Sequence, residues 1–185
     1  METATLAGGC FWCTEAIFKR LKGIKSVVSG YTGGTTENPN YEQVSSGNTG
    51  HAEAIQIKFD PKIISFEEIL DVFWATHDPT TLNKQGADTG TRYRSAIFYH
   101  GETQKQIAEK SIQKLEKSGK FKNTIVTKIE EFTNFYPAES YHQNFYERNK
   151  DSNPYCPLTI GPKIQKLMRE FSKDVKEEYK VTVLT

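Results

Sequence analysis

The spacing of hydrophobic residues along the chain predicts a succession of strands and helices. Strand-type segments, in which apolar residues alternate with polar ones or form a short run, occur at 4–7, 27–31, 52–59, 95–99 and 124–129. Helical spacing of apolar residues extends from about residue 10 to a stop at Gly23, and recurs at 65–76, 102–118, 139–148 and 162–173. Two segments rich in glycine and small polar residues, 32–50 and 77–94, are predicted loops, and the second is long enough to suggest a functional role.

This irregular order of elements predicts an α+β fold in a single domain. We expect a two-layer sandwich of helices on a mixed, mainly antiparallel sheet with a ferredoxin-like core, rather than a doubly wound parallel sheet. Residues 1–170 form the predicted main domain. The charged segment 171–185, which has a short strand-like end, is expected to be a peripheral tail.

Length, charge and hydropathy exclude several classes of protein. The chain has 185 residues and a net charge of +1, so it lacks the field that would hold nucleic acid. Its apolar runs are shorter than the roughly 18 residues of a membrane helix, and the first residues show no secretory signal. We therefore expect a cytoplasmic monomer that binds neither nucleic acid nor membrane.

The octet GGCFWCTE at residues 8–15 is the segment most indicative of chemistry. A strand, two glycines and a helix start place Cys10 where backbone N–H groups and the helix dipole favour an anion. We therefore expect a lowered pKa for the Cys10 thiol and a nucleophilic thiolate. Cys13 lies one helical turn away, where a disulfide with Cys10 would distort the first turn and be readily exchanged.

Two other interpretations of the cysteines remain open at this point. Cys10 and Cys13 could be small buried hydrophobic residues, although the two glycines before them are poor core material. They could also bind zinc together with Cys156 and either His142 or His51, but no second pair of residues has the spacing of zinc ligands. An odd number of cysteines does not suggest a disulfide framework and favours reactive thiols.

A carboxylate lies on an apolar face of the strand predicted at 52–59. Glu53 shares this face with Ile55, Ile57 and Phe59. Burial on the core side would raise the pKa of Glu53 and suit it to general acid catalysis near neutral pH. Alternatively, Glu53 lies at the strand end with its carboxylate in water, which the pattern alone slightly favours. The glycines just before the strand allow close backbone approach and support the functional interpretation.

Three further segments, YEQVSSGNTGHAE, HDPTTLNKQGADTGTRYRSAIF and ESYHQNFY, follow the octet in order between about residues 6 and 164. Together with GGCFWCTE they resemble the methionine sulfoxide reductase A family. The resemblance implies an oxidoreductase that reduces methionine S-sulfoxide, both in oxidised proteins and as the free amino acid, and so repairs oxidative damage. It also implies no bound cofactor or metal, and an external thiol reductant such as thioredoxin.

The resemblance assigns roles to particular residues. Cys10 is expected to attack the sulfoxide sulfur and become a sulfenic acid, while Glu53 protonates the departing oxygen. Tyr41 and Tyr93 are expected to hydrogen-bond this oxygen, and Asp88 to help hold the oxygen site in order.

The resemblance also assigns residues to binding of the substrate methyl group and to formation of a disulfide with Cys10. Phe11 and Trp12 match the family's apolar pocket for the methyl group. A resolving thiol then condenses with the sulfenic acid to form a disulfide. Many relatives have a small residue in place of Cys13 and use a C-terminal cysteine, here Cys156. Because Cys13 is one helical turn from Cys10, we expect it to react first, with Cys156 as a second resolving thiol or a bystander.

The third segment departs from the family pattern at one residue. Phe145 stands where better known members carry Tyr, so one hydroxyl contact is lost or is supplied by Tyr146. His142 and Gln143 match family positions and are expected to support the site. The rival functions are a thioredoxin-like disulfide oxidoreductase and a zinc-stabilised binding module, which a thiol titration with metal analysis would separate from the reductase.

Overall fold

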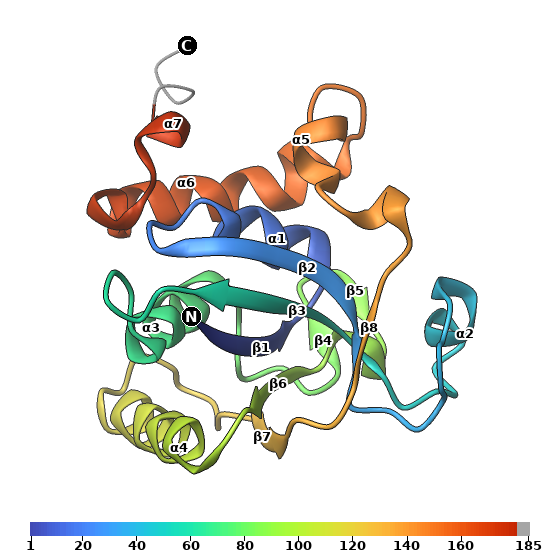
Figure 1. Ribbon diagram of the computed structural model, residues 1–185, viewed down its shortest axis with the longest axis horizontal. Coiled ribbons are helices and arrows are strands. Elements are labelled where there is room, and N and C mark those ends of the chain that lie inside the picture. Colours follow the sequence, from blue (N-terminus) through green and yellow to red (C-terminus); the bar gives the residue numbers. More distant parts are fainter. Residues whose placement is uncertain (181–185) are drawn as a thin grey trace.

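The computed structural model describes residues 1–180, and it contains one large mixed sheet. Its strands are β1 (Glu2–Gly8), β2 (Ile24–Thr32), β3 (Ala52–Phe59), β6 (Ser95–Tyr99), β7 (Lys128–Glu131) and β8 (Phe135–Pro137), in the order β7-β6-β1-β3-β2-β8 (Figure 1). Neighbouring strands are antiparallel except for β6 and β7, which are parallel. Strands β4 (Lys84–Gln85) and β5 (Asp88–Thr89) form a separate pair. The predicted α+β fold with a mixed, mainly antiparallel sheet is confirmed.

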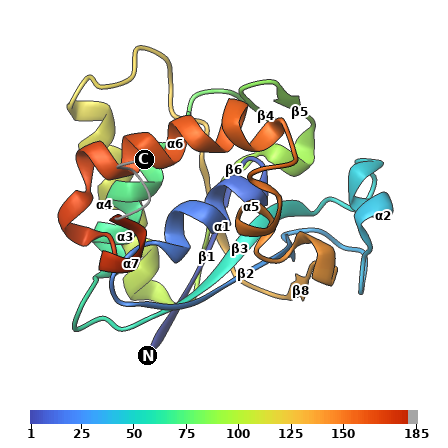
Figure 2. The ribbon, with the colours of Figure 1, turned by 90° about the horizontal axis from the view of Figure 1, so that it is seen from above.

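Helices pack around the sheet. They are α1 (Phe11–Lys19), α2 (Tyr41–Ser45), α3 (Phe66–Thr76), α4 (Glu102–Lys117), α5 (Phe145–Asn149), α6 (Gly161–Glu170) and α7 (Glu177–Lys180). Short 3-10 turns occur at Thr91–Tyr93, Ser140–His142 and Ser172–Asp174, and a π-helical turn at Cys156–Ile160. Helix α1 packs on β2 and β3 and lies between the sheet and α6 (Figure 2). The helix that carries the octet is therefore enclosed on two sides.

Local sequence explains where α3 begins. The Ser65 hydroxyl accepts a hydrogen bond from the Glu68 backbone N–H (3.2 Å), and the Glu68 carboxylate accepts one from the Ser65 N–H (2.7 Å). This reciprocal capping satisfies two donors of the first turn and is worth about 1 kcal/mol. The apolar stripe predicted from the sequence, which includes Leu70 and Phe73, is buried.

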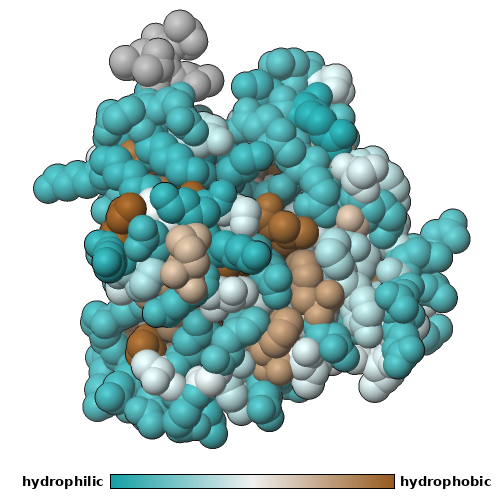
Figure 3. Space-filling view, in the orientation of Figure 1, coloured by the Kyte–Doolittle hydropathy of each residue, from teal (hydrophilic) through white to brown (hydrophobic). Residues whose placement is uncertain are grey.

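The core lies between the central strands and the helices. Residues Ala4 to Gly8 of β1 are buried, as are Ile55, Ile57 and Phe59 of β3. Each of the large apolar side chains among them, those of Leu6, Ile55, Ile57 and Phe59, contributes about 1.5–3 kcal/mol by leaving water. Since β1 is a central strand, its carboxyl end is held rigidly where the chain turns into α1. The outer face in Figure 3 is mostly hydrophilic, with hydrophobic side chains in small separate groups.

Several elements differ from the sequence predictions. The predicted loop at 32–50 contains α2, whose first turn is capped by Asn40 in a second capping box. The helix predicted at 139–148 is interrupted at Asn144, which has φ +54° because its backbone N–H bonds the Glu15 carboxylate of α1. Strand β7 begins four residues later than predicted, and β8 was not predicted.

The segment expected to be peripheral packs against the domain as far as residue 180. Val175 is fully buried and forms a bridge with Leu21, and the Tyr179 ring lies 4.7 Å from the Arg20 guanidinium. The apolar residues of this segment explain the difference, because they reach the end of α1 and leave the charged residues outside. The predicted strand-like end falls at 181–185, outside the described residues. Within residues 1–180, no helix is long and apolar enough to cross a membrane.

Candidate active site

Two glycines carry the chain from β1 to Cys10. Gly9 has φ +94°, and a Cβ added to it would lie 2.6 Å from the Gln85 side chain. A Cβ on Gly8 would lie 2.8 Å from the Phe73 ring. Only glycine fits both positions. Cys10 therefore forms the N-cap of α1 at a fixed place and is 7% exposed.

A small cavity of about 50 Å³ opens beside Cys10. It is lined by Cys10, Phe11, Trp12, Tyr41, Glu53, Asp88, Tyr93 and Tyr155. The structure thus brings together all seven residues that the sequence analysis assigned to catalysis and substrate binding, and adds Tyr155. Larger hollows occur elsewhere, such as one of about 370 Å³ beside Trp74 and Leu115, but that hollow contains no thiol.

Glu53 is buried on the core side of β3, which is one of the two positions considered from the sequence; the other placed its carboxylate in water. Its side chain is 2% exposed, and one carboxyl oxygen accepts a hydrogen bond from the Phe11 backbone N–H (3.1 Å) at the start of α1. Burial raises the pKa of Glu53 to about 8, while the Phe11 N–H and Arg92, whose Nε lies 3.8 Å from the carboxylate, act in the opposite direction. At neutral pH, Glu53 is therefore mainly protonated and holds a proton inside the cavity.

The Cys10 thiol does not have the lowered pKa predicted from the sequence. Burial raises the pKa of Cys10 well above its ordinary value, and the hydrogen bond with Cys13 and the charge of Glu53 act in the same direction. The hydrogen bond from Cys10 lowers the pKa of Cys13 to about 7, and Lys163 contributes further, against the effect of burial. Of the two thiols, Cys13 is therefore the one that ionises first, while Cys10 keeps its proton. Of the two sulfurs, only that of Cys10 belongs to a residue lining the cavity.

Arg92, which the sequence analysis did not single out, connects the polar wall of the cavity. Its Nη2 donates a hydrogen bond to the Tyr93 hydroxyl (2.8 Å), and its guanidinium lies over the rings of Tyr93 and Tyr41 at 4.7 Å and 5.8 Å. Burial raises the pKa of Tyr93 and keeps its hydroxyl a hydrogen-bond donor at neutral pH. The sequence feature that could have indicated a role for Arg92 is its position directly before Tyr93.

Tyr155 is a cavity residue that the sequence analysis did not single out. Its hydroxyl donates a hydrogen bond to Asp88 (2.8 Å) and lies 3.8 Å from the Cys13 sulfur. Burial raises the pKa of this phenol, so it remains neutral. Asp88 thus orients the Tyr155 hydroxyl that lies beside the Cys13 sulfur. The only sequence signal was the position of Tyr155 beside Cys156.

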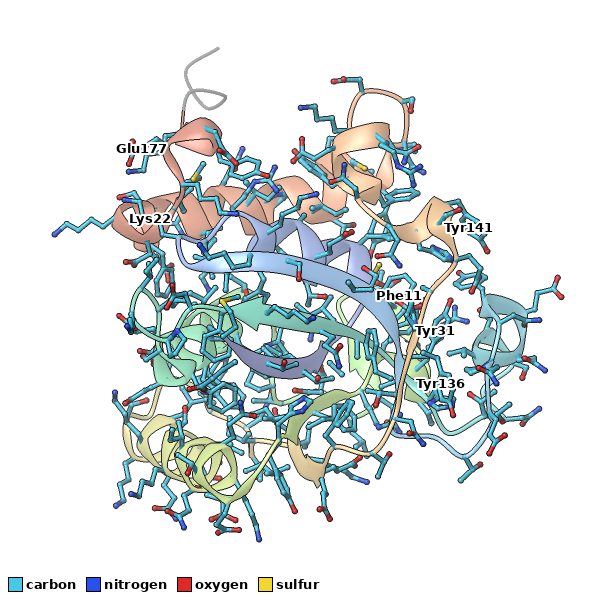
Figure 4. The ribbon with its side chains drawn as sticks, in the orientation of Figure 1. Phe11, Lys22, Tyr31, Tyr136, Tyr141 and Glu177 are labelled. Atoms are coloured by element: carbon cyan, nitrogen blue, oxygen red, sulfur yellow. The ribbon has the colours of Figure 1, made fainter. Side chains whose placement is uncertain are left out.

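Phe11 and Trp12 form the apolar wall of the cavity. The Phe11 ring lies 5.8 Å from that of Tyr31 on β2 (Figure 4). The Trp12 indole stacks on Phe145 with 3.6 Å between ring centroids, and donates a hydrogen bond to His142 Nδ1 (3.1 Å). Phe145, the departure from the family pattern, therefore supports Trp12 by stacking and supplies no hydroxyl.

Cys156 lies apart from the cavity lining. It is fully buried in the π-helical turn and shares a hydrophobic cluster with Cys10 and Cys13. All three cysteines are free thiols.

The histidines that were considered as zinc ligands have other partners. His51 accepts a hydrogen bond from the Gly34 N–H (3.0 Å) and contacts the Thr36 carbonyl (2.7 Å), whereas His142 accepts from Trp12. No group of three or more His, Cys, Asp or Glu suited to a metal is found among residues 1–180.

Comparison with known proteins gives a single family. The sequence model for peptide methionine sulfoxide reductase matches residues 2–176. The peptide methionine sulfoxide reductase MsrA of Saccharolobus solfataricus is 54% identical over 176 residues, which cover 95% of this chain and 98% of that protein. Among solved structures, reduced Mxr1 from Saccharomyces cerevisiae is similar with a TM-score of 0.75 and 37% identity, covering 84% of this chain and 89% of that chain. Mxr1 in complex with Trx2 gives a TM-score of 0.52 and 29% identity, covering 78% and 84%.

Proposed function

The chain belongs to the peptide methionine sulfoxide reductase family and reduces methionine sulfoxide, and we propose that Cys10 and Glu53 perform this reaction on the S epimer. The observation that carries the assignment is the cavity itself, which joins a thiol, a protonated carboxyl and two aromatic rings. A sulfoxide needs these three features, because its sulfur accepts a nucleophile, its oxygen requires a proton to leave and its methyl group is apolar.

The lining residues suggest how the substrate lies. The methyl group packs against Phe11 and Trp12, where sulfur-aromatic contacts are favourable. The sulfoxide oxygen points toward Glu53 and the hydroxyls of Tyr41 and Tyr93, which supply the polar part of the cavity lining. This orientation presents the sulfur to Cys10.

The reaction then proceeds in two balanced steps. Cys10 transfers its thiol proton to its hydrogen-bonding partner Cys13, and the resulting thiolate forms a bond to the sulfoxide sulfur. The oxygen takes the proton of Glu53 and forms a bond to the Cys10 sulfur, while its bond to the substrate sulfur and the new sulfur–sulfur bond both break. This leaves methionine, a Cys10 sulfenic acid and a Glu53 carboxylate. In the second step a thiol attacks the sulfenic sulfur and the hydroxyl leaves, with a proton, as water.

We propose Cys13 as the first resolving thiol. It is hydrogen-bonded to Cys10, and its pKa of about 7 gives a substantial thiolate fraction at neutral pH. Cys156 lies in the same hydrophobic cluster but is fully buried in the π-helical turn. It serves as a second resolver that receives the disulfide from Cys13 when the turn moves.

The disulfide must be reduced by an external thiol, for which a thioredoxin-type protein is the proposed partner. The support is the solved complex of Mxr1 with Trx2, a structure similar to this chain. Such a cycle needs no bound cofactor. It suits a reducing compartment, and we propose the cytoplasm.

The arrangement of strands supports a finer description of the fold. The order β6-β1-β3-β2, with α1 between β1 and β2 and α3 between β3 and β6, is the order of a ferredoxin-like β-α-β-β-α-β unit. We propose that this unit, as the centre of the catalytic domain, is a two-layer core to which the remaining elements are added.

The decisive experiment is a reductase assay with separated epimers. A peptide containing one methionine S-sulfoxide, its R counterpart and the two free amino acids are each incubated with the protein and dithiothreitol, and methionine is measured. We expect reduction of the S epimers alone, and none with Cys10→Ser as the control. Equal rates on both epimers, or no reaction of S, would refute the proposal.

A further inference from the structure

The substrate cavity is backed by a histidine that does not line it. We propose that His142, backed by Glu139, is a positioning residue that fixes the Trp12 indole as the wall of the substrate cavity. The inference rests on the proposed function of that cavity, and it assigns to His142 an effect on substrate binding rather than on the chemical step.

The first observation is the hydrogen bond from the Trp12 indole N–H to His142 Nδ1, at 3.1 Å. A neutral imidazole has one nitrogen that accepts and one that carries a proton. Because Nδ1 accepts from Trp12, the proton of His142 is on Nε2. His142 is 1% exposed, so water does not compete for this acceptor.

The second observation concerns the other ring nitrogen. His142 Nε2 is buried without a hydrogen-bond partner and lies 3.8 Å from a carboxylate oxygen of Glu139. A carboxylate at this distance attracts an N–H and repels a lone pair, so Glu139 favours the tautomer that Trp12 requires. The same carboxylate accepts hydrogen bonds from the Tyr31 hydroxyl (3.2 Å) and the Tyr41 backbone N–H (3.3 Å), which hold it in place.

The third observation is that the His142 ring contacts the cavity wall from behind. Its centroid lies 5.0 Å from that of Phe11, 5.7 Å from Trp12 and 4.7 Å from Tyr41. The Trp12 indole is thus fixed by stacking on Phe145 at one face and by the hydrogen bond at its edge. A wall fixed before the substrate arrives binds it without a further loss of side-chain entropy.

Two variants of His142 distinguish the effect of its hydrogen-bond acceptor, Nδ1, from the effect of its aromatic ring. His142→Phe keeps an aromatic ring of similar size and removes the acceptor, so the indole N–H loses its partner and turns toward water. His142→Asn removes the ring but places an amide oxygen close to the position of Nδ1. We expect His142→Phe to raise KM about 3- to 10-fold, the effect of one ordinary hydrogen bond. We expect kcat to change less than about twofold, and His142→Asn to restore most of the affinity.

The NMR signal of the Trp12 indole N–H gives a readout that does not depend on turnover. The chain has two tryptophans, and Trp74→Phe identifies the second signal. We expect the Trp12 signal to shift in His142→Phe and to remain near its original position in His142→Asn. In the unaltered protein, imidazole ¹⁵N signals should show His142 protonated on Nε2, with an unprotonated Nδ1 that accepts a hydrogen bond. This measurement tests the proposal even if a variant fails to fold.

Four results would overturn the proposal, and three of them concern His142 and Trp12 directly. The first is a His142 proton found on Nδ1, and the second is a Trp12 indole signal that does not shift in His142→Phe. The third is an increase in KM of the same size in His142→Asn and His142→Phe. A fall in kcat at unchanged KM would also contradict it. If the unaltered protein reduces no sulfoxide, the proposed function is wrong. The tautomer of His142 and the indole signal of Trp12 would still show whether His142 positions the indole.

Discussion

Replacing Glu53 by glutamine should stabilise the protein increasingly as the pH rises. A rise in the pKa of this carboxyl from 4.5 to about 8 means that the folded state resists its ionisation. At about 1.4 kcal/mol for each unit of pKa, the full effect is about 5 kcal/mol. Glutamine has nearly the same shape and no ionisation, so Glu53→Gln removes this cost.

The sign of the effect follows from proton binding. Between pH 4.5 and about 8 the folded protein holds a proton on Glu53 that the unfolded chain has released. The stability that the neutral carboxyl provides is complete below pH 4.5 and is lost as the pH rises toward 8. Within this window, the free energy of unfolding of the unaltered protein should fall, relative to Glu53→Gln, by about 1.4 kcal/mol per pH unit.

The assay is urea unfolding of both proteins, with a thiol reductant, at several values between pH 5.5 and 7.5. The difference in unfolding free energy should change by about 3 kcal/mol over this range. Other titrating groups are common to both proteins, so their contributions cancel to first order. Curves that stay parallel would show that Glu53 has an ordinary pKa and would refute the reasoning.

The same variant separates stability from activity. In a single turnover with one equivalent of S-sulfoxide, Glu53→Gln should form methionine about 10²–10⁴ times more slowly, because it has no proton to transfer. A protein that is more stable and nearly inactive is the expected outcome for a residue whose burial serves the reaction. A rate within about threefold of the unaltered protein would rule out the role of acid.

Three further outcomes are expected. Cys10→Ser should form no methionine from one equivalent of sulfoxide, as measured by chromatography, and appreciable product would overturn its assignment as nucleophile. Mass spectrometry after a single turnover should find a Cys10–Cys13 disulfide first, and an earlier bridge to Cys156 would reverse the proposed order. Glu15→Ala should lower the free energy of unfolding in urea by about 2–3 kcal/mol, because the carboxylate that accepts the Asn144 N–H is lost; an unchanged midpoint would contradict this.

The parts of the site that could be predicted from the sequence lie on regular elements. The alternation along β3 placed Glu53 on the face of Ile55 and Ile57, and the glycines before Cys10 marked a strand that turns into a helix. Periodicity could not decide whether Glu53 is buried. That depends on α1, which covers the end of β3 and supplies the Phe11 N–H.

Other features depend on contacts between distant segments. Tyr155 enters the site through Asp88, 67 residues earlier, and no local pattern encodes that pairing. The prediction of a lowered pKa for Cys10 considered the helix start alone and omitted the burial and the neighbouring carboxylate that prevail. The helix predicted across Asn144 was wrong because a long-range hydrogen bond from the Asn144 N–H to the Glu15 carboxylate outweighs helical propensity.

The central position of β1 determines when, during synthesis, the cysteines that follow this strand become buried. This strand is made first, yet both of its neighbours, β3 and β6, follow much later, and Cys156 is later still. At about 5–20 residues per second, roughly 7–30 s pass between the synthesis of Cys13 and that of Cys156. Helix α6, which packs on α1, is also made only near the end of translation, so both cysteines of the octet remain open to oxidants on the growing chain. An enzyme that repairs oxidative damage is thus itself most vulnerable to oxidation before it has folded.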